Sequence, residues 1–301
     1  MSHFTVLAVG NNPGEMLAPF QENNMGNCPK EYLKFNDMED EYKEEWKNKT
    51  TKAIFVDGKY YLSYDERFRV KGSEGILSID SFAVPEGLKE EDVPLNKIYK
   101  SFKEFVEKWH GYKARDEQKK RYGYWENPNA KWDWYQIGGR WAGFFKLKNG
   151  KEGVLGSKSW CNKDKEIDKN RADQAFKKDI DFEGMLSDNF EKNSKIYDDF
   201  EEMMKSDPKK AKQEAYWSFG IENKGDKDNF IPETREEYIK RTSFPSTFAV
   251  LKDGKWYEKG EMGWWAMVSN EKDPSEWHKE FQKLLKDLPD DTLLTIVDCH
   301  I

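Results

Sequence analysis

Both ends of the chain carry a short apolar run of the kind that forms buried β-strands. The N-terminal run, His3 to Val9, is rich in β-branched and aliphatic residues and stops at the turn sequence Gly10 to Gly14. The C-terminal run, Thr292 to Val297, has the same character. Strands that are apolar on both faces lie inside a sheet, with other elements covering both of its sides. We therefore expect the two ends of the chain to meet in one central sheet.

Hairpin and helix patterns alternate between these ends. Asp57-Gly58, Asn149-Gly150 and Asp253-Gly254 each separate two apolar runs, which is typical of type I′ hairpin turns. Apolar residues at helical spacing predict several helices. The main ones cover residues 97–109, 171–204 with a break near 179–184, 208–217, 232–241 and 274–288.

This order of elements predicts an α+β fold. We expect a central, mostly antiparallel sheet of the ferredoxin-like kind, with hairpins and a helix-rich insertion. Residues 1–170 and 242–301 are predicted to form the sheet-centred body. Residues 171–241 are predicted to form a helical insertion or cap, because their apolar pattern is mainly helical.

A tryptophan-rich segment stands in the middle of the chain. Six of the twelve tryptophans fall between Trp109 and Trp160. The same segment holds eleven Lys and Arg residues against five Asp and Glu, a net charge of +6 in a chain whose net charge is −7. It is thus a basic island in an acidic protein, which suits a local binding site for a small anion.

The centre of this island combines aromatic rings, two adjacent glycines and one arginine. Aromatic faces stack on planar groups such as nucleobases, and a guanidinium forks onto phosphate. Adjacent glycines let a ligand approach the backbone closely. Strand alternation would place Trp132 and Trp134 on one face and Tyr135 on the other. The candidate ligand-binding residues are Trp132, Trp134, Tyr135, Gly138, Gly139, Arg140 and Trp141.

The same residues also fit a purely structural role. Large rings are buried on average, so each tryptophan could fill the core. Arg140 could then form an ordinary ion pair with Asp133 or Glu126. The island as a whole favours function, because a core has no need of the local positive charge.

The two terminal strands supply a second candidate group. His3 opens the first strand, and Asp298, Cys299 and His300 end the last. If these strands are adjacent and antiparallel, the start of one lies beside the end of the other, and His3 and His300 become neighbours. A group of His, Asp and Cys suits acid–base or nucleophilic catalysis. The alternative is that the backbone satisfies these strand-end histidines.

No metal-binding or cofactor-binding pattern is present. The three cysteines are widely spaced without a CxxC motif, and no two of the four histidines have the spacing of metal ligands. Lysines alternate with one run of carboxylates, which favours a solvated helix face over a magnesium site. These carboxylates are Asp164, Asp168, Asp173, Asp179, Asp181 and Glu183. We therefore expect neither a metal nor a cofactor.

Composition limits the partners of the chain. An isoelectric point near 5.4 argues against general nucleic-acid binding, which requires a basic face. No apolar stretch approaches the ~20 residues of a membrane span, and the start of the chain does not have the pattern of a signal peptide. An odd number of scattered cysteines is typical of a reducing compartment. We expect a cytoplasmic protein without membrane contact.

Long strings at both ends and in the centre carry a resemblance to a known family. They cover residues 2–7, 17–24, 122–141, 172–175, 179–182, 247–257 and 297–301. On these strings the chain resembles a widespread family of hypothetical proteins carried by bacteriophages and by bacteria with prophages. The resemblance implies a phage accessory protein, outside the virion-building set, in the cytoplasm of a bacterial host cell. It carries no catalytic residues across.

These observations lead to three functional hypotheses. The first is a non-catalytic protein that binds and sequesters a small anionic, nucleotide-derived ligand, which in a phage setting would be a host immune signal. The second is a hydrolase that acts on such a nucleotide through His3, His300, Cys299 or Asp298. The third is a protein–protein inhibitor of a host defence factor, acting through the acidic surface. A second copy of the chain is a further candidate partner.

Overall fold

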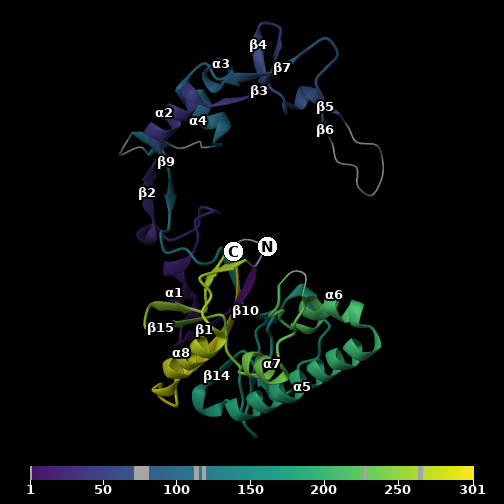
Figure 1. Cartoon of the computed structure of the whole chain (residues 1–301). Helices are drawn as coiled ribbons and strands as arrows, with labels where there is room; N and C mark the ends of the chain where they lie inside the picture. Colours follow the sequence, from purple (N-terminus) through teal and green to yellow (C-terminus); the bar gives the residue numbers. More distant parts are fainter. Residues whose placement is uncertain (1, 71–80, 112–114, 117–119, 227–228, 264–266) are drawn as a thin grey trace. The chain divides into compact units, whose positions relative to one another are not determined.

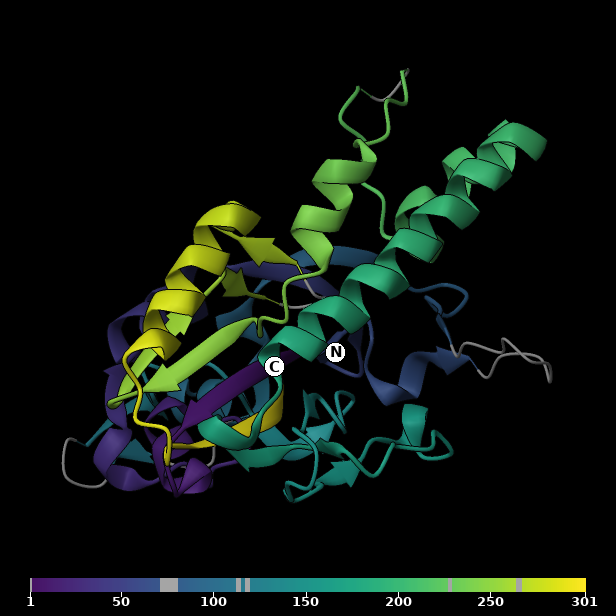
Figure 2. The ribbon, with the colours of Figure 1, turned by 90° about the horizontal axis from the view of Figure 1, so that it is seen from below.

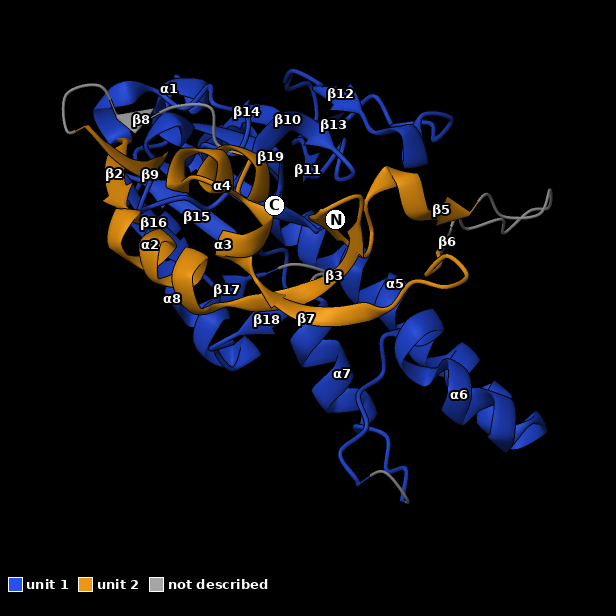
Figure 3. Cartoon of the chain, turned by 90° about the horizontal axis from the view of Figure 1, so that it is seen from above, with its two compact units in different colours: residues 1–32, 127–301 blue, residues 33–126 orange. Residues whose placement is uncertain are grey.

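The computed structural model describes residues 2–70, 81–111, 115–116, 120–226, 229–263 and 267–301. Contacts within the chain define two compact units, shown in different colours in Figure 3: unit 1 contains residues 1–32 and 127–301, and unit 2 contains residues 33–126. Both units contain helices and strands, and the fold is α+β as the sequence predicts. Residues 171–241, predicted from the sequence as a helical insertion or cap, belong to unit 1, and residues 33–126 form unit 2.

Unit 2 is built from short elements around its own aromatic core. Its elements are β2 (Lys34–Asp37), α2 (Glu39–Asn48), β3 (Thr50–Val56), β4 (Lys59–Leu62), β5 (Arg69–Val70), β6 (Ser81–Phe82), β7 (Glu90–Pro94), α3 (Leu95–Ile98), α4 (Phe102–Trp109), β8 (Arg115–Asp116) and β9 (Arg121–Glu126). The buried residues Tyr42, Leu95 and Phe105 belong to this core. Asp57 and Gly58 both have positive φ, so the predicted β3–β4 hairpin is confirmed together with its turn.

Unit 1 is built around one large sheet. Its elements are β1 (His3–Val9), α1 (Pro13–Leu17), β10 (Trp134–Gly139), β11 (Phe145–Lys146), β12 (Ser157–Lys158), β13 (Arg171–Ala172), β14 (Gln174–Phe176), α5 (Phe182–Ser206), α6 (Pro208–Phe219), α7 (Arg235–Thr242), β15 (Ala249–Lys252), β16 (Lys255–Glu258), β17 (Glu261–Met262), β18 (Val268–Ser269), α8 (Pro274–Lys286) and β19 (Leu293–His300). The strand order is β12-β10-β19-β1-β15-β16, and β14 also pairs with β19.

The two ends of the chain do meet in this sheet. β1 and β19 are adjacent and antiparallel over their whole length, and Figure 1 shows the two chain ends side by side. β15 then runs parallel to β1 and forms the predicted hairpin with β16. β19 shares its other edge between two short strands, β10 and β14. The sheet is mostly antiparallel, but this order is not clearly that of a ferredoxin-like layer.

Each face of the sheet has its own core. On one face, Leu7, Val250 and Ile296 pack with Trp277 and Phe281 of α8, which Figure 2 shows lying along the sheet. Val6, Ala249 and Val297 point to the other face and pack in a second cluster with Leu17 of α1. Strand alternation therefore decides which end-of-strand residues share a face.

The segment after residue 141 departs from the sequence prediction in two places. The hairpin predicted at Asn149-Gly150 does not form, because β11 pairs with β13 and Val154 bridges to Gln174. Residues 171–176 are strands instead of the start of a helix, and α5 begins at Phe182. Asp181 fixes this start as the N-cap, since its side chain accepts a hydrogen bond from the Gly184 amide.

His278 on α8 links the stability of unit 1 to pH. Burial lowers the pKa of His278, and the charge of Lys259 lowers it further. The unfolded chain therefore binds the proton more readily than the folded chain does, between the ordinary histidine pKa and the lowered one. We expect the free energy of unfolding to fall as the pH drops through about 6.5 toward 5, and to fall less in His278→Gln. Urea unfolding of both proteins across this range measures the difference, and parallel curves would contradict the prediction.

Candidate functional site

The register of the unit 1 sheet places three ring side chains in one row, at the end of the sheet where the two chain ends meet. His3 on β1 faces His300 on β19, and His300 faces Trp134 on β10. The two imidazole rings are 5.0 Å apart between centroids and nearly perpendicular, at 75°. The antiparallel pairing on which the neighbourhood of His3 and His300 depends is therefore the one that forms.

His3 is held by a buried carboxylate on the neighbouring strand. Its Nδ1 lies 2.8 Å from Oδ1 of Asp298, whose side chain is fully buried. The other oxygen of Asp298 accepts a hydrogen bond of 2.9 Å from the Arg140 backbone amide. An ionised carboxylate only accepts hydrogen bonds, so Nδ1 of His3 carries the proton and donates it. This arrangement fixes the ring and leaves Nε2 as its chemically available nitrogen.

His300 is held in the same way by Asp133. Its Nδ1 lies 2.6 Å from Oδ1 of Asp133, and the same oxygen accepts a hydrogen bond of 2.7 Å from the Trp134 amide. The Asp133 amide donates to the His300 carbonyl while Trp134 is the register partner of His300, so two residues of one strand oppose one residue of the other. Such a bulge turns the Asp133 side chain toward the histidine.

Nε2 of His300 is buried and has no hydrogen-bond partner among the described residues. Only 8% of the side-chain surface of either histidine is exposed. A buried polar atom without a partner has lost its hydration without compensation, and binding sites are one setting in which such atoms occur. This nitrogen is the strongest structural sign that a ligand group belongs here.

Trp134 forms the outer wall of the row. Its ring stacks on His300 with centroids 5.2 Å apart and an angle of 17°, and it meets His3 edge-on at 5.3 Å. Trp134 nevertheless keeps 36% of its surface exposed. The indole can therefore cover the histidines and still offer surface to a planar ligand group.

The other predicted aromatic residues lie in the core. Trp132 is buried, donates its indole N–H to the Leu17 carbonyl at 3.1 Å, and contacts the half-buried Tyr135. The sequence prediction that Trp132 and Trp134 share a face is wrong, since β10 starts only at Trp134, after the bulge. Trp141 is half-buried against the cluster on the α8 face of the sheet. Of the predicted rings, Trp134 is the one placed beside the histidines.

Gly138 and Gly139 make room for buried carboxylates within the protein. Both have positive φ, at 78° and 57°. A Cβ atom on Gly138 would lie 2.5 Å from the Asp173 carboxylate, and one on Gly139 would lie 2.3 Å from that of Asp298. The close approach predicted for a ligand is thus made by Asp173 and Asp298 of the chain itself.

Arg140 remains available for a ligand. It is exposed, and its guanidinium forms no ion pair with any residue in the described ranges. The pairing with Asp133 considered from the sequence does not form, because Asp133 binds His300 and accepts a hydrogen bond from Asn24. The backbone amide of Arg140 is hydrogen-bonded to Asp298, the same carboxylate that holds His3.

Cys299 is separated from the histidines. It points to the opposite face of β19, where it is fully buried in the cluster with Phe4 and Val297. Burial raises the pKa of its thiol well above the ordinary value, and the charge of Asp298 raises it further. A thiol of this kind does not supply a thiolate, so Cys299 is not brought into the site with its neighbours His300 and Asp298.

Asp173 and Asp133 are the carboxylates whose roles the sequence does not reveal. Asp173 is fully buried and accepts hydrogen bonds from the amides of Gly143, Phe144 and Gly156 at 2.7, 3.3 and 2.8 Å. Burial raises the pKa of its carboxyl, although these three bonds act in the opposite direction. Its expected place on a solvated helix face is wrong, because Asp173 is buried between the strands β13 and β14. No periodic pattern marks either residue.

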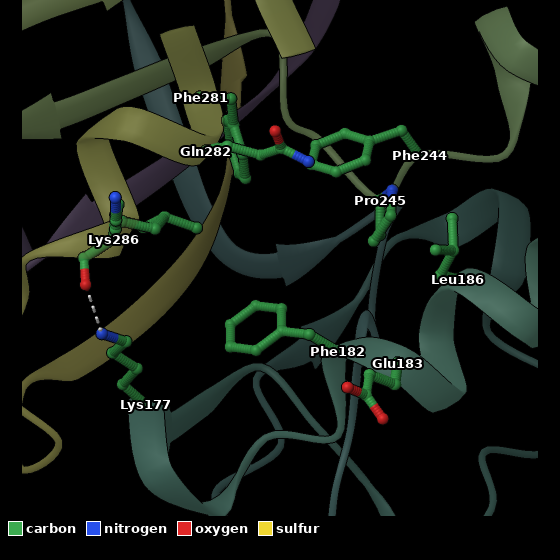
Figure 4. Close-up of a pocket in the computed structure, with 10 residues that line it drawn as sticks. Lys177, Phe182, Glu183, Leu186, Phe244, Pro245, Phe281, Gln282 and Lys286 are labelled. Carbon is green, nitrogen blue, oxygen red and sulfur yellow. Dashed lines mark hydrogen bonds between the residues drawn. The ribbon is translucent and has the colours of Figure 1, made fainter. Parts of the chain in front are cut away.

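A separate cavity of about 380 Å³ lies between α5 and α8. Phe182, Phe244 and Phe281 line it, with Lys177 and Glu183 at its edge (Figure 4). Lys177 is already engaged, since its ammonium group donates to the carbonyls of Lys286 and Leu288 at the end of α8. This lining suits an apolar group and offers no histidine or cysteine for chemistry.

The described residues contain neither a metal-binding cluster nor a membrane-spanning helix, and the chain matches no known protein. Among the described residues, no group of three or more His, Cys, Asp or Glu side chains is arranged to hold a metal ion. Within the same ranges, no helix combines the length and apolar character needed to cross a membrane. No protein-family model, curated protein or solved structure matches the chain. The function is therefore inferred from the residues of the site itself.

Proposed function

We propose that the chain binds and sequesters a small anionic, nucleotide-derived ligand at the row formed by His3, His300 and Trp134. The observation that carries this proposal is the buried Nε2 of His300, which has no hydrogen-bond partner among the described residues and lies beneath an exposed indole. A protonated imidazole donates from Nε2 to a phosphate oxygen, and the indole stacks on a nucleobase. The Arg140 guanidinium, which forms no ion pair with any described residue, supplies a second donor for phosphate.

The biological setting follows from the family resemblance of the sequence. A phage accessory protein in a bacterial cytoplasm meets the nucleotide signals that the host makes during defence. A binder that holds such a signal lowers its free concentration without needing a reaction. We propose this role, with a host immune signal as the ligand class.

The direct test is to identify small molecules that copurify with the protein. The chain would be purified, denatured and filtered, and the filtrate analysed by mass spectrometry. A stoichiometric nucleotide that is absent from a Trp134→Ala preparation is the expected result. If the preparation carries no nucleotide, and cyclic dinucleotides and ADP-ribose derivatives all leave its melting temperature unchanged, the proposal fails.

Replacing Trp134 by alanine should weaken binding without unfolding unit 1. A stacked base contributes about 1–3 kcal/mol, so we expect the Kd for a bound cyclic dinucleotide to rise about 5- to 150-fold. Isothermal titration calorimetry gives this value. Trp217→Ala on α6 is the matched control, since Trp217 is 86% exposed and lies outside the row. Equal effects of the two substitutions would remove Trp134 from the site.

A hydrolase is the second candidate function. The specific observation in its favour is that each of two adjacent imidazoles has a carboxylate on Nδ1. This pattern is found where histidines transfer protons.

A further inference from the structure

We infer that His3 and His300 form a general acid–base pair that cleaves a phosphodiester bond in the bound nucleotide. The inference rests on the proposed function for the ligand class and for its binding at this site, and it puts cleavage in place of sequestration as the way in which the free ligand is lowered. It names the substrate class as a phosphodiester and assigns the two histidines as its catalytic residues.

The hydrogen bonds to Asp298 and Asp133 fix the tautomer of each histidine ring. Asp298 and Asp133 accept hydrogen bonds from the Nδ1 atoms of His3 and His300, so both rings keep a proton on Nδ1. Nε2 then becomes a base when the ring is neutral and an acid when it is protonated. Both states are compatible with the same ring position, because the carboxylate stays on Nδ1 throughout.

The two histidine rings also lie close to each other. Their centroids are 5.0 Å apart, and they are held on adjacent strands of the central sheet. Proton transfer needs a hydrogen bond of about 2.6–3.2 Å. Because the two rings are this close together, the oxygen atoms of one phosphoryl group can form such a bond to each ring. Rigid strands hold such a pair more precisely than loops do.

The two histidines are also shielded from solvent. Each histidine side chain is 8% exposed, and Trp134 lies flat over His300. Asp298 and Asp133 contact the two rings, and one further carboxylic group lies near Asp133: Glu22, whose pKa is raised by burial and by the charge of Asp133. The indole therefore shields one face of the His300 ring from water and keeps its own outer face for a nucleobase.

The proposed reaction needs only water as the second reactant. One neutral imidazole removes a proton from water through Nε2, and the water oxygen forms a new bond to phosphorus. The bond between phosphorus and the leaving oxygen breaks, and the other imidazolium gives its Nε2 proton to that oxygen. The products are a phosphomonoester and an alcohol, with no change in oxidation state. Exchange of one proton with solvent restores both rings.

The test uses the purified full chain and a panel of cyclic di-AMP, cyclic di-GMP, 2′,3′-cyclic GMP–AMP and cyclic tri-AMP. Melting temperatures identify the members that bind, and liquid chromatography with mass spectrometry shows whether these are converted to linear phosphomonoesters. Conversion is the expected result. Binding without conversion overturns the acid–base inference and leaves the proposed function intact. If no member binds, the inference fails, and if ADP-ribose derivatives also leave the melting temperature unchanged and no nucleotide copurifies, the proposed function fails as well.

Two variants separate catalysis from a structural role. His3→Gln and His300→Gln should each slow conversion of a bound nucleotide about 10²- to 10⁴-fold, while the melting temperature stays near that of the parent. His278→Gln, which lies outside the row, is the control and should leave the rate unchanged.

Bis(p-nitrophenyl) phosphate then distinguishes the two proton transfers. Nitrophenolate leaves without needing a proton, so the variant that lacks the general acid should cleave this probe almost as fast as the parent. The variant that lacks the base should stay slow. Equal losses toward both kinds of substrate in both variants would assign the histidines a purely structural role and overturn the inference.

Discussion

Asp173→Ala is expected to destabilise unit 1 strongly. The substitution removes the acceptor of three backbone amides, those of Gly143, Phe144 and Gly156, at a position that is fully buried. A buried donor left without a partner costs about 1–3 kcal/mol, and water entering the space recovers part of this. We expect the free energy of unfolding in urea to fall by about 3–5 kcal/mol.

Asparagine at the same position should have a smaller effect. Oδ1 of Asp173 serves the amides of Gly143 and Phe144, while Oδ2 serves Gly156. The side-chain carbonyl of asparagine can keep the first two bonds, and its NH₂ group then opposes the third. Asp164→Ala is the matched control, because Asp164 is exposed on the preceding loop. A loss for Asp173→Ala no greater than that of the control would contradict the role of these bonds.

Arg241→Met is the second substitution with a large expected effect. Arg241 on α7 pairs with both oxygens of Glu233, which is 1% exposed, and donates to the Gly220 carbonyl at 2.7 Å. Removing the cation leaves a buried carboxylate without its partner. Breaking such a pair costs about 3–5 kcal/mol, and we expect this loss in the free energy of unfolding.

The same helix offers the control. Arg235 pairs with Asp198, and the side chains are 44% and 60% exposed. Exposed pairs contribute about 0–1 kcal/mol, so Arg235→Met should lower the free energy of unfolding by no more than that. The prediction also concerns the packing of α5, α6 and α7, because Tyr197 and Tyr238 belong to the buried cluster of these helices and Tyr197 donates a hydrogen bond to the Glu233 carbonyl. Similar losses for the two arginines would show that burial of Glu233 does not set the energy.

Local chemistry made the hairpins and the terminal strands predictable. Asp57-Gly58 and Asp253-Gly254 both adopt positive φ, which the two central positions of a type I′ turn require. Asn149-Gly150 is a turn pair of the same kind, but no hairpin forms around it. The strand next to it, β11, finds β13 as its partner. Turn residues permit a hairpin, and the strands available for pairing decide whether it forms.

The candidate site was predictable only in part. Because His3 starts one strand and His300 ends another, the sequence states the condition for their meeting, which is antiparallel pairing. It does not show that β1 and β19 are adjacent, nor that Asp133 reaches His300 through a bulge. The roles of the tryptophans were also predictable only in part. Trp132 lies in the core and Trp134 lies beside the histidines, because β10 starts between these two residues.

The sequence by itself determined the α+β class, the apolar terminal strands, the two turns and the residue types that any site must use. These features depend on contacts between neighbours along the chain, whose periodicity is visible in one dimension. Only the tertiary structure decided the register of β1, β19 and β10, the carboxylate partner of each histidine and the burial of Cys299. Register is set by which faces can be buried together across the whole sheet, and a shift of one residue would send His3 and His300 to opposite faces.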